Sequence, residues 1–295
     1  MHDHGHHHKE LNEKNILLAF FLNAGFAVIE FVGGYLTNSV AIYSDALHDL
    51  GDSIALLFSY FAEKMSSKKA DLQFTYGYRR FSVLAALING LILLVGSTFI
   101  ISEAIQRLQS PEPVHAPGVI FLSLLGLSVN GFAAYRMSKN SGLNSRMLMF
   151  HLLEDILGWC AVLVVSIVLL FKPWYFLDSV LSILIAVIII NGVIKNLYQV
   201  SKILLQSFPS KIDRKKLEQD ILGFNNVLGV HFIQGWSLDD SSFNLTLHVK
   251  VSSELQMKKV DALRVQIETY LRANQILYTT IQFEGSECVT SETGI

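Results

Sequence analysis

Long hydrophobic runs fill most of residues 15–206, and they restrict what this chain can fold into. Hydrophobic residues make up 51% of the sequence and charged residues only 16%, and the apolar residues come in long runs that a soluble domain of this size could not bury. Each run is close to the roughly 20 residues that cross the hydrocarbon core of a membrane as a helix. We therefore expect six membrane-spanning helices, at about Ile16–Tyr35, Val40–Phe61, Phe81–Ser102, Pro117–Tyr135, Met147–Phe171 and Trp174–Ile194.

The loops between these runs indicate the orientation. Lys and Arg concentrate after the second run and after the fourth run, and cytoplasmic loops accumulate such residues. Both termini are therefore expected in the cytoplasm. The first run lacks the features of a cleaved signal peptide and is interpreted as a mature helix. A net charge of −2 and the absence of a basic, aromatic surface give no indication of a nucleic-acid partner.

The chain becomes polar after the sixth run, which predicts three parts: a His-rich tail at 1–14, a membrane domain at 15–206 and a soluble domain at 207–295. Apolar periodicity in the last part predicts the order α-β-β-α-β, an α+β fold with two helices on one face of a small sheet. The expected elements are Ile212–Leu222, Val227–Leu238, Phe243–Val251, Leu255–Leu271 and Ile276–Phe283.

Two of the hydrophobic runs carry the same pair of side chains at one-turn spacing. His48 is followed by Asp52, and His151 is followed by Asp155. Residues four apart lie on one face of a helix, and ionisable groups at membrane depth are costly and usually mark an ion pathway. Two imidazoles and two carboxylates form a tetrahedral set that suits zinc. The sequence predicts a zinc site within the membrane.

Other polar residues in the runs are open to two interpretations. Asp45 lies close to the face of His48 and is either an outer ligand or a proton relay. Asp49 and Glu154 lie about 100° away from the ligand faces on a helix of 3.6 residues per turn, so they are not assigned as ligands. Glu30 and Asp178 either line the ion path or hold neighbouring helices together through hydrogen bonds.

Three motifs resemble one known family over nearly the whole chain, from about Lys14 onward. They are Ser44 to Asp52, Phe74 to Arg80 leading into Val83 to Gly90, and His151 to Asp155, and together they resemble the cation diffusion facilitator family of zinc transporters. The resemblance implies a homodimer of six-helix protomers that exchange zinc for protons. It also implies a cytoplasmic domain similar to a metallochaperone, and a transport site formed by His48, Asp52, His151 and Asp155.

The same resemblance implies accessory metal ligands in the soluble domain. His231 and His248 occupy places where relatives carry ligands, with Glu284 or Cys288 as further candidates, although two strand histidines can equally be structural. Relatives with a loop site before the third span use His where this chain has Phe74 and Tyr78, so that site is expected to be missing. The tail contains His2, His4, His6, His7 and His8, a composition that binds metal weakly, and a tuning role is expected.

The expected transport function and its alternatives follow from the four expected metal ligands. Histidine and carboxylate ligands must lose protons to bind zinc, so the chain is expected to be a proton-coupled antiporter that exports Zn²⁺ by alternating access. A broader exporter of cadmium, cobalt or iron(II) and a non-transporting metal sensor are the alternatives. Neither His48 nor His151 is followed by the Glu of an H-E-x-x-H metallohydrolase, so no enzyme is expected. A bacterial inner membrane is the expected location.

Overall fold

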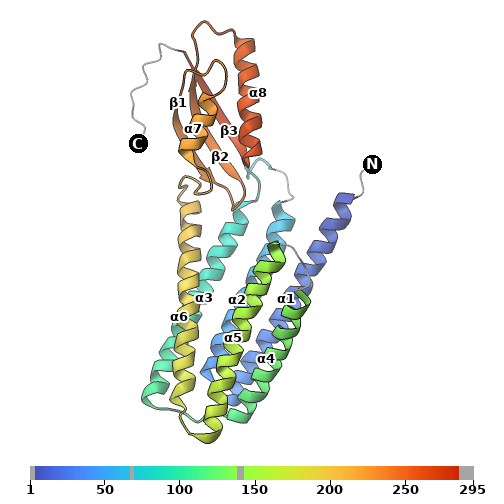
Figure 1. The fold of residues 1–295 in the computed structure, drawn as a ribbon, viewed down its shortest axis with the longest axis vertical. Helices are drawn as coiled ribbons and strands as arrows, with labels where there is room; N and C mark the ends of the chain where they lie inside the picture. The colour runs from blue at the N-terminus through green and yellow to red at the C-terminus, as the bar shows by residue number, and fades with distance from the viewer. Residues whose placement is uncertain (1–3, 67–69, 138–142, 286–295) are drawn as a thin grey trace. The chain divides into compact units, whose positions relative to one another are not determined.

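The computed structural model describes residues 4–66, 70–137 and 143–285. Some helical side chains inside these ranges are also not described, among them those of residues 4–19 and His151. Figure 1 shows six long helices followed by a smaller α/β region. The long helices are α1 (His4–Thr37), α2 (Val40–Ser66), α3 (Arg80–Gln109), α4 (Ala116–Met137), α5 (Leu143–Phe171) and α6 (Phe176–Leu204).

Contacts divide the chain into two compact units. The first contains Met1–Lys64 and Ala85–Leu197, and the second contains Met65–Leu84 and Tyr198–Ile295. The segment that joins α2 to α3 therefore groups with the C-terminal region, although the sequence pattern does not indicate this. Each unit has its own core.

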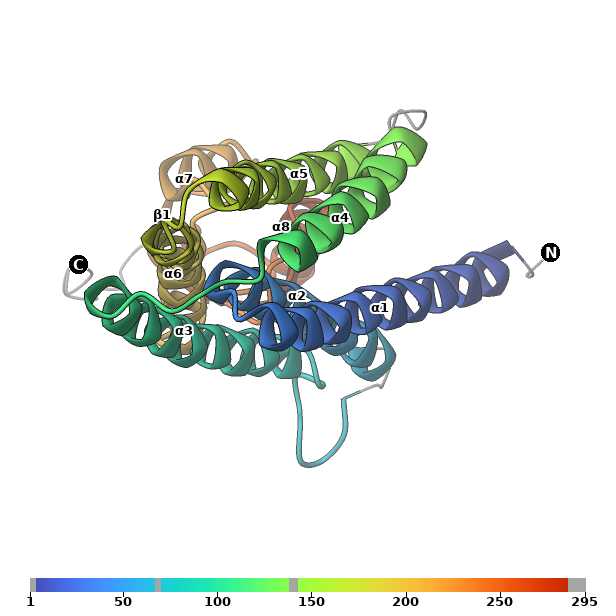
Figure 2. The same cartoon turned by 90° about the horizontal axis from the view of Figure 1, so that it is seen from below.

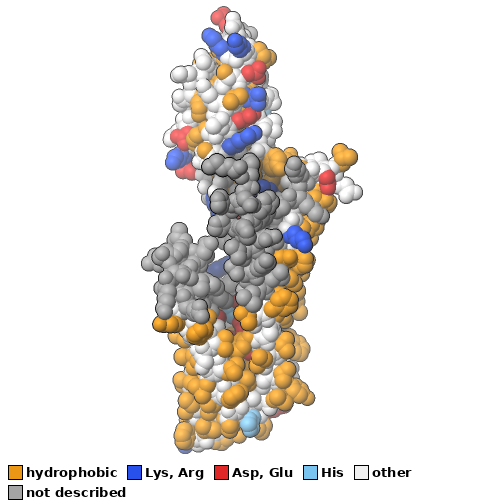
Figure 3. Space-filling view, turned by 90° about the vertical axis from the view of Figure 1, so that its right-hand side faces the viewer, with side chains coloured by type: hydrophobic (Ala, Val, Ile, Leu, Met, Phe, Trp, Pro, Cys, Tyr) orange, Lys and Arg blue, Asp and Glu red, His pale blue; other side chains and the backbone are white. Residues whose placement is uncertain are grey.

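Helices of the first unit expose apolar side chains, as expected in a lipid environment. Val95 and Phe99 of α3 are 70% and 73% exposed, and Figure 3 shows apolar side chains spread over these helices. Within the described residues, four helices are long and apolar enough to cross a membrane, in α1, α3, α4 and α6. Helix α2, which contains three aspartates, is not in this group, and the apolar part found in α5 is the shorter Asp155–Phe171.

Close packing of small residues brings the helices of this unit together. Helix α4 packs along α5, as Figure 2 shows, and a side chain at Gly126 would overlap the buried ring of Trp159. A second apolar cluster joins α2, α3 and α6 through residues such as Leu47, Leu93 and Ile189. The site-bearing helices α2 and α5 thus each have a packed neighbour.

Asp178 of helix α6 caps the N-terminus of helix α2. Its carboxylate accepts hydrogen bonds from Ser39 Oγ at 2.5 Å and from the backbone N–H groups of Val40 and Ala41 at 2.7 and 3.4 Å. These are the donors that a helix leaves unpaired at its N-terminus. Of the two interpretations offered by the sequence, the helix-joining one describes the contacts of Asp178.

The second unit has the expected α-β-β-α-β order. Its elements are α7 (Arg214–Leu222), β1 (Gly229–Ser237), β2 (Phe243–Lys250), α8 (Met257–Ala273) and β3 (Ile276–Glu284). Strand β2 is central, antiparallel to β1 and parallel to β3. The predicted fold class is confirmed, and the predicted bounds agree with the observed ones to within about two residues.

The core of this unit lies between the sheet and its two helices. Leu245, Leu247 and Val249 of β2 are fully buried against apolar residues of α7 and α8. Side chains alternate between the faces of a strand, so His248 points to the opposite face of the sheet. That face carries the polar cluster described below.

Candidate metal centres

His48 and Asp52 lie one turn apart on α2, as their spacing predicts. The imidazole Nε2 of His48 is 3.8 Å from Oδ2 of Asp52, and it is 3.9 Å from Oδ1 of Asp155 on α5. All three residues belong to the first unit. The structure therefore brings one nitrogen and two carboxylate oxygens from two different helices to one place.

These separations have the size expected of ligands that share an ion. Two ligand atoms at about 2.1 Å from a tetrahedral zinc are about 3.4 Å apart. A direct hydrogen bond between nitrogen and oxygen would instead be about 2.9 Å long. The distances around His48 are closer to ligand spacing than to a hydrogen bond.

His151 lies one turn before Asp155 on α5, but its side chain is outside the described residues. The backbone of α5 is helical there, so the two residues share a helix face. The side chains of His48 and Asp52 are 31% and 30% exposed and that of Asp155 is 11% exposed. The group is thus partly enclosed and still reachable by a small ion.

Three further carboxylates continue the polar interior beyond this group. Asp45 and Asp49 of α2 are each 7% exposed and Glu30 of α1 is 1% exposed. Oδ1 of Asp45 lies 3.9 Å from the position of a β-carbon at Gly158, so Asp45 faces α5 one turn beyond Asp155. Its place suits either role that the sequence left open.

Two polar residues of α1, Asn23 and Glu30, differ in how they contact α2. The amide of Asn23 donates to the backbone carbonyl of Asp49 at 3.2 Å, which joins the two helices. Asp45, Asp49 and Asp155 interact electrostatically with the carboxylate of Glu30. Glu30 therefore extends the acidic interior that α2 and α5 begin.

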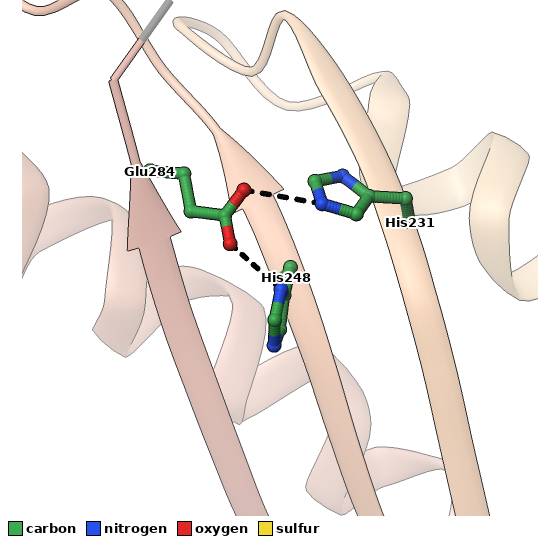
Figure 4. A group of neighbouring side chains, drawn as sticks. All are labelled: His231, His248 and Glu284. Carbon is green, nitrogen blue, oxygen red and sulfur yellow. Dashed lines mark ion pairs between the residues drawn. The ribbon is translucent and has the colours of Figure 1, made fainter. Parts of the chain in front are cut away.

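The second unit holds a compact cluster of His231, His248 and Glu284, one from each strand (Figure 4). His231 Nε2 is 3.1 Å from Oε2 of Glu284, and His248 Nδ1 is 2.7 Å from Oε1 of the same carboxylate. One ligand atom from each residue lies within 4.8 Å of the others. Glu284 is only 5% exposed.

Sheet geometry explains why these three residues meet. His231 and His248 are direct partners in the antiparallel pair, and Glu284 lies opposite Lys250 in the parallel pair. A bulge follows His231, where Phe232 has a positive φ of 52°, and the rings of Phe232 and His248 are 4.7 Å apart. The register brings the predicted residues together, while the bulge could not be anticipated from the sequence pattern.

The remaining expected ligands lie outside the described structure. Cys288 and His2 are in ranges that are not described, and the side chains of His4, His6, His7 and His8 are not described either. Gln282 Nε2 donates to Oε1 of Glu284 at 3.2 Å, a contact of the cluster that the sequence analysis did not identify. Alternation along β3 is the signal that could have found it, since Gln282 and Glu284 share a face.

Comparison with known proteins extends these observations over nearly the whole chain. A family profile described as the cation efflux transmembrane domain matches residues 16–205, and one described as the cation efflux protein cytoplasmic domain matches residues 209–286. The chain is 35% identical to the "Cadmium, cobalt and zinc/H(+)-K(+) antiporter" of Bacillus subtilis, over 95% of this chain and 92% of the relative.

Two other relatives show similar coverage. The chain is 33% identical to "Zinc transporter ZitB" of Pectobacterium atrosepticum, over 97% of this chain and 90% of that protein. It is 31% identical to "Metal cation efflux system protein CzcD" of Cupriavidus metallidurans, again over 97% of this chain and 90% of the relative. The similarity therefore includes both structural units.

Proposed function

Because the chain belongs to the cation efflux family, also called the cation diffusion facilitators, we propose that it exports Zn²⁺ across a membrane in exchange for protons. The names of its relatives support a divalent-cation efflux transporter, and their substrates include zinc, cadmium and cobalt. The observation that carries the proposal is the position of His48 Nε2, within 4 Å of carboxylates on both α2 and α5.

The ligands link metal binding to proton movement. Zinc binds only neutral imidazole and ionised carboxylate, so each binding event displaces any protons held by His48, His151, Asp52 and Asp155. On the more acidic side of the membrane, protons compete for the same atoms and favour metal release. The two carboxylates also offset the charge of the ion in the low-dielectric interior.

Transport requires the site to open alternately to the two sides. The ligands lie on two helices, so a movement of α2 against α5 changes access and ligand geometry together. Helix α2 is fixed at its start by Asp178 of α6, and α5 is packed along α4. We propose that each helix moves with its packed neighbour.

A reconstituted system tests the proposal directly. Purified protein in proteoliposomes is expected to move zinc at a rate that depends on the pH gradient, and zinc movement is expected to change the internal pH. A zinc dye and a pH dye read the two fluxes together. Zinc flux that neither responds to the gradient nor alters it would exclude proton exchange.

Metal selectivity tests the ligand assignment. His48→Asp replaces an imidazole nitrogen by a carboxylate oxygen, which removes part of the nitrogen–oxygen set that suits zinc, and is expected to broaden transport toward cadmium or iron(II). His115→Gln is the matched control, because His115 lies on the loop between α3 and α4 and is exposed. Unchanged selectivity in His48→Asp would contradict the assignment.

A broader divalent exporter is the second candidate, and the name of the Bacillus subtilis relative favours it. Competition of cadmium and cobalt with zinc in the same liposomes separates the two. Manganese is expected to compete poorly, because it prefers octahedral oxygen ligands. A sensor without transport activity predicts zinc binding without flux.

For the soluble unit we propose a regulatory zinc site at His231, His248 and Glu284, in a domain that dimerises. The cytoplasmic-domain profile and the three convergent ligands support this assignment. We further propose that both termini lie in the cytoplasm of a bacterial cell and that the His-rich tail only tunes transport. Loss of all flux on deletion of residues 1–14 would contradict the last point.

A further inference from the structure

The loop before α3 is ordered by several hydrogen bonds of its own. Asp71 Oδ1 accepts backbone hydrogen bonds from Gln73 and Phe74 at 2.9 and 2.7 Å, and its Oδ2 accepts the Tyr78 hydroxyl at 2.5 Å. Gly77 has a φ of 76° and donates to the carbonyl of Phe74 at 2.8 Å. This is the second motif of the sequence, and neither metal group uses it.

The same loop is attached to the sheet domain within the second unit. Arg79 Nη1 donates to Ser242 Oγ and lies 3.5 Å from Oδ2 of Asp239. The rings of Tyr76 and Tyr278 meet edge to face at 5.1 Å between centroids. These contacts join the loop to the β1–β2 connection and to β3.

Between the loop and the sheet domain lies a cavity of about 360 Å³, within the usual range for small-ligand sites. Its walls contain Arg79 and Arg80, and none of the described residues that line it is acidic. The charge of Arg79 is offset by Asp239, but Nε of Arg80 is buried and has no hydrogen-bond partner among the described residues. A buried guanidinium donor without a partner is costly, which points to a missing acceptor.

The chemistry of the walls indicates the type of ligand. Guanidinium groups match phosphate oxygens in geometry and charge, and Arg80 is the first residue of α3, where the helix dipole also favours an anion. Helix α3 is one of the apolar spanning helices, so Arg80 lies where the chain enters the membrane. Phe81 and Trp236 add the aromatic surface that is common at headgroup depth.

We propose that this cavity binds a phosphate group, carried either by the headgroup of an anionic phospholipid or by free phosphate. The acceptor oxygens would pair with Arg80, while Arg79 keeps its bonds to the sheet domain. Such a ligand would add a further link between the loop before α3 and the sheet domain, both within the second unit.

Native mass spectrometry of the full-length protein tests this proposal. Detergent-purified protein is incubated with phosphatidylglycerol, phosphatidylcholine or inorganic phosphate, and bound copies are counted. We expect at least one phosphatidylglycerol or phosphate per protomer and about 10-fold weaker retention in Arg80→Gln, the effect of losing a charged hydrogen bond. Gln73→Glu, which adds a negative charge to the wall, is expected to weaken binding without removing any packing.

Arg272→Gln on α8 is the matched control, because Arg272 does not line the cavity, and its retention is expected to equal that of the unsubstituted chain. Retention of phosphatidylglycerol alone identifies the lipid, and displacement of that lipid by millimolar phosphate identifies the free ion. Equal retention of phosphatidylcholine, or unchanged binding in both Arg80→Gln and Gln73→Glu, would overturn the proposal. A melting curve of each variant shows that it is folded.

Discussion

The two groups of metal-ligand side chains have similar chemistry but very different supports. In the membrane unit, His48 Nε2 lies 3.8 and 3.9 Å from its carboxylate partners, which come from two helices. In the sheet unit, the carboxylate of Glu284 is 3.1 and 2.7 Å from the two imidazoles, on neighbouring strands. The ligand atoms of the first group lie farther apart than direct partners, whereas each imidazole of the second group lies at ion-pair distance from the carboxylate.

The difference follows from how the two supports can move. Strands in a sheet are linked by backbone hydrogen bonds, so His231, His248 and Glu284 keep a fixed register. Helices are linked to each other mainly by side-chain packing and a few side-chain hydrogen bonds, so they can slide or tilt. The proposed transport site thus lies on the support that can move, and the proposed regulatory site lies on the support that keeps its register.

The largest expected effect is the loss of one ligand from the helical group. Asp155→Ala removes the only described carboxylate that α5 contributes near His48, and zinc flux in proteoliposomes is expected to fall by at least about 100-fold, since a ligand exceeds the 10- to 100-fold effect of an outer-shell residue. His115→Gln is expected to transport normally. Substantial flux in Asp155→Ala would contradict the assignment of the helical group as the transport site.

Removal of the central carboxylate of the sheet group is expected to have a smaller effect. Glu284→Gln keeps the shape but removes the charge, and zinc binding at the soluble unit is expected to weaken about 10- to 100-fold while proton-coupled flux continues. Equilibrium dialysis of the full-length protein measures the number of tightly bound zinc ions. An unchanged number would mean that the histidines are structural.

The support of the helical group can be tested through Asp178. Asp178→Ala leaves Ser39 and the first N–H groups of α2 without their acceptor, and is expected to destabilise the protein by about 2 kcal/mol. Thermal unfolding in detergent measures this loss. A variant as stable as the original chain would show that α2 does not depend on α6 for its position.

The smallest expected effect concerns the two helices that pack on the sheet and support its metal-ligand group. The hydroxyl of Tyr270 on α8 donates to Asp220 on α7 at 2.5 Å, and burial together with this bond raises the pKa of Tyr270 to about 12. The folded chain therefore keeps a proton that the unfolded chain loses near pH 10. This contribution is complete below pH 10 and disappears as the pH rises toward 12.

Tyr270→Phe removes that dependence and is expected to cost about 1 kcal/mol below pH 10, the usual value of one hydrogen bond. Urea unfolding at pH 8 and at pH 11 measures the loss of unfolding free energy and its dependence on pH. We expect the difference between the two chains to shrink at the higher pH, and an undiminished difference would contradict the assigned role of the hydroxyl.

Much of the architecture could be read from the residues because its cause is local. Hydrophobic length alone predicts the spanning helices, and apolar alternation predicts the α-β-β-α-β order that the second unit shows. One-turn spacing likewise predicts that His48 and Asp52 face one point. These features depend only on chain geometry and on the cost of exposing apolar or polar groups.

Other features depend on residues that are far apart in the chain. That Asp155 approaches His48, that Glu284 meets two histidines, and that Arg79 bonds the sheet domain were decided by helix packing and strand register. The amino-acid pattern alone determined which polar side chains lie in apolar helices and therefore need polar partners. Only the tertiary structure decided which partners they found, because pairing across elements depends on the packing of every intervening side chain.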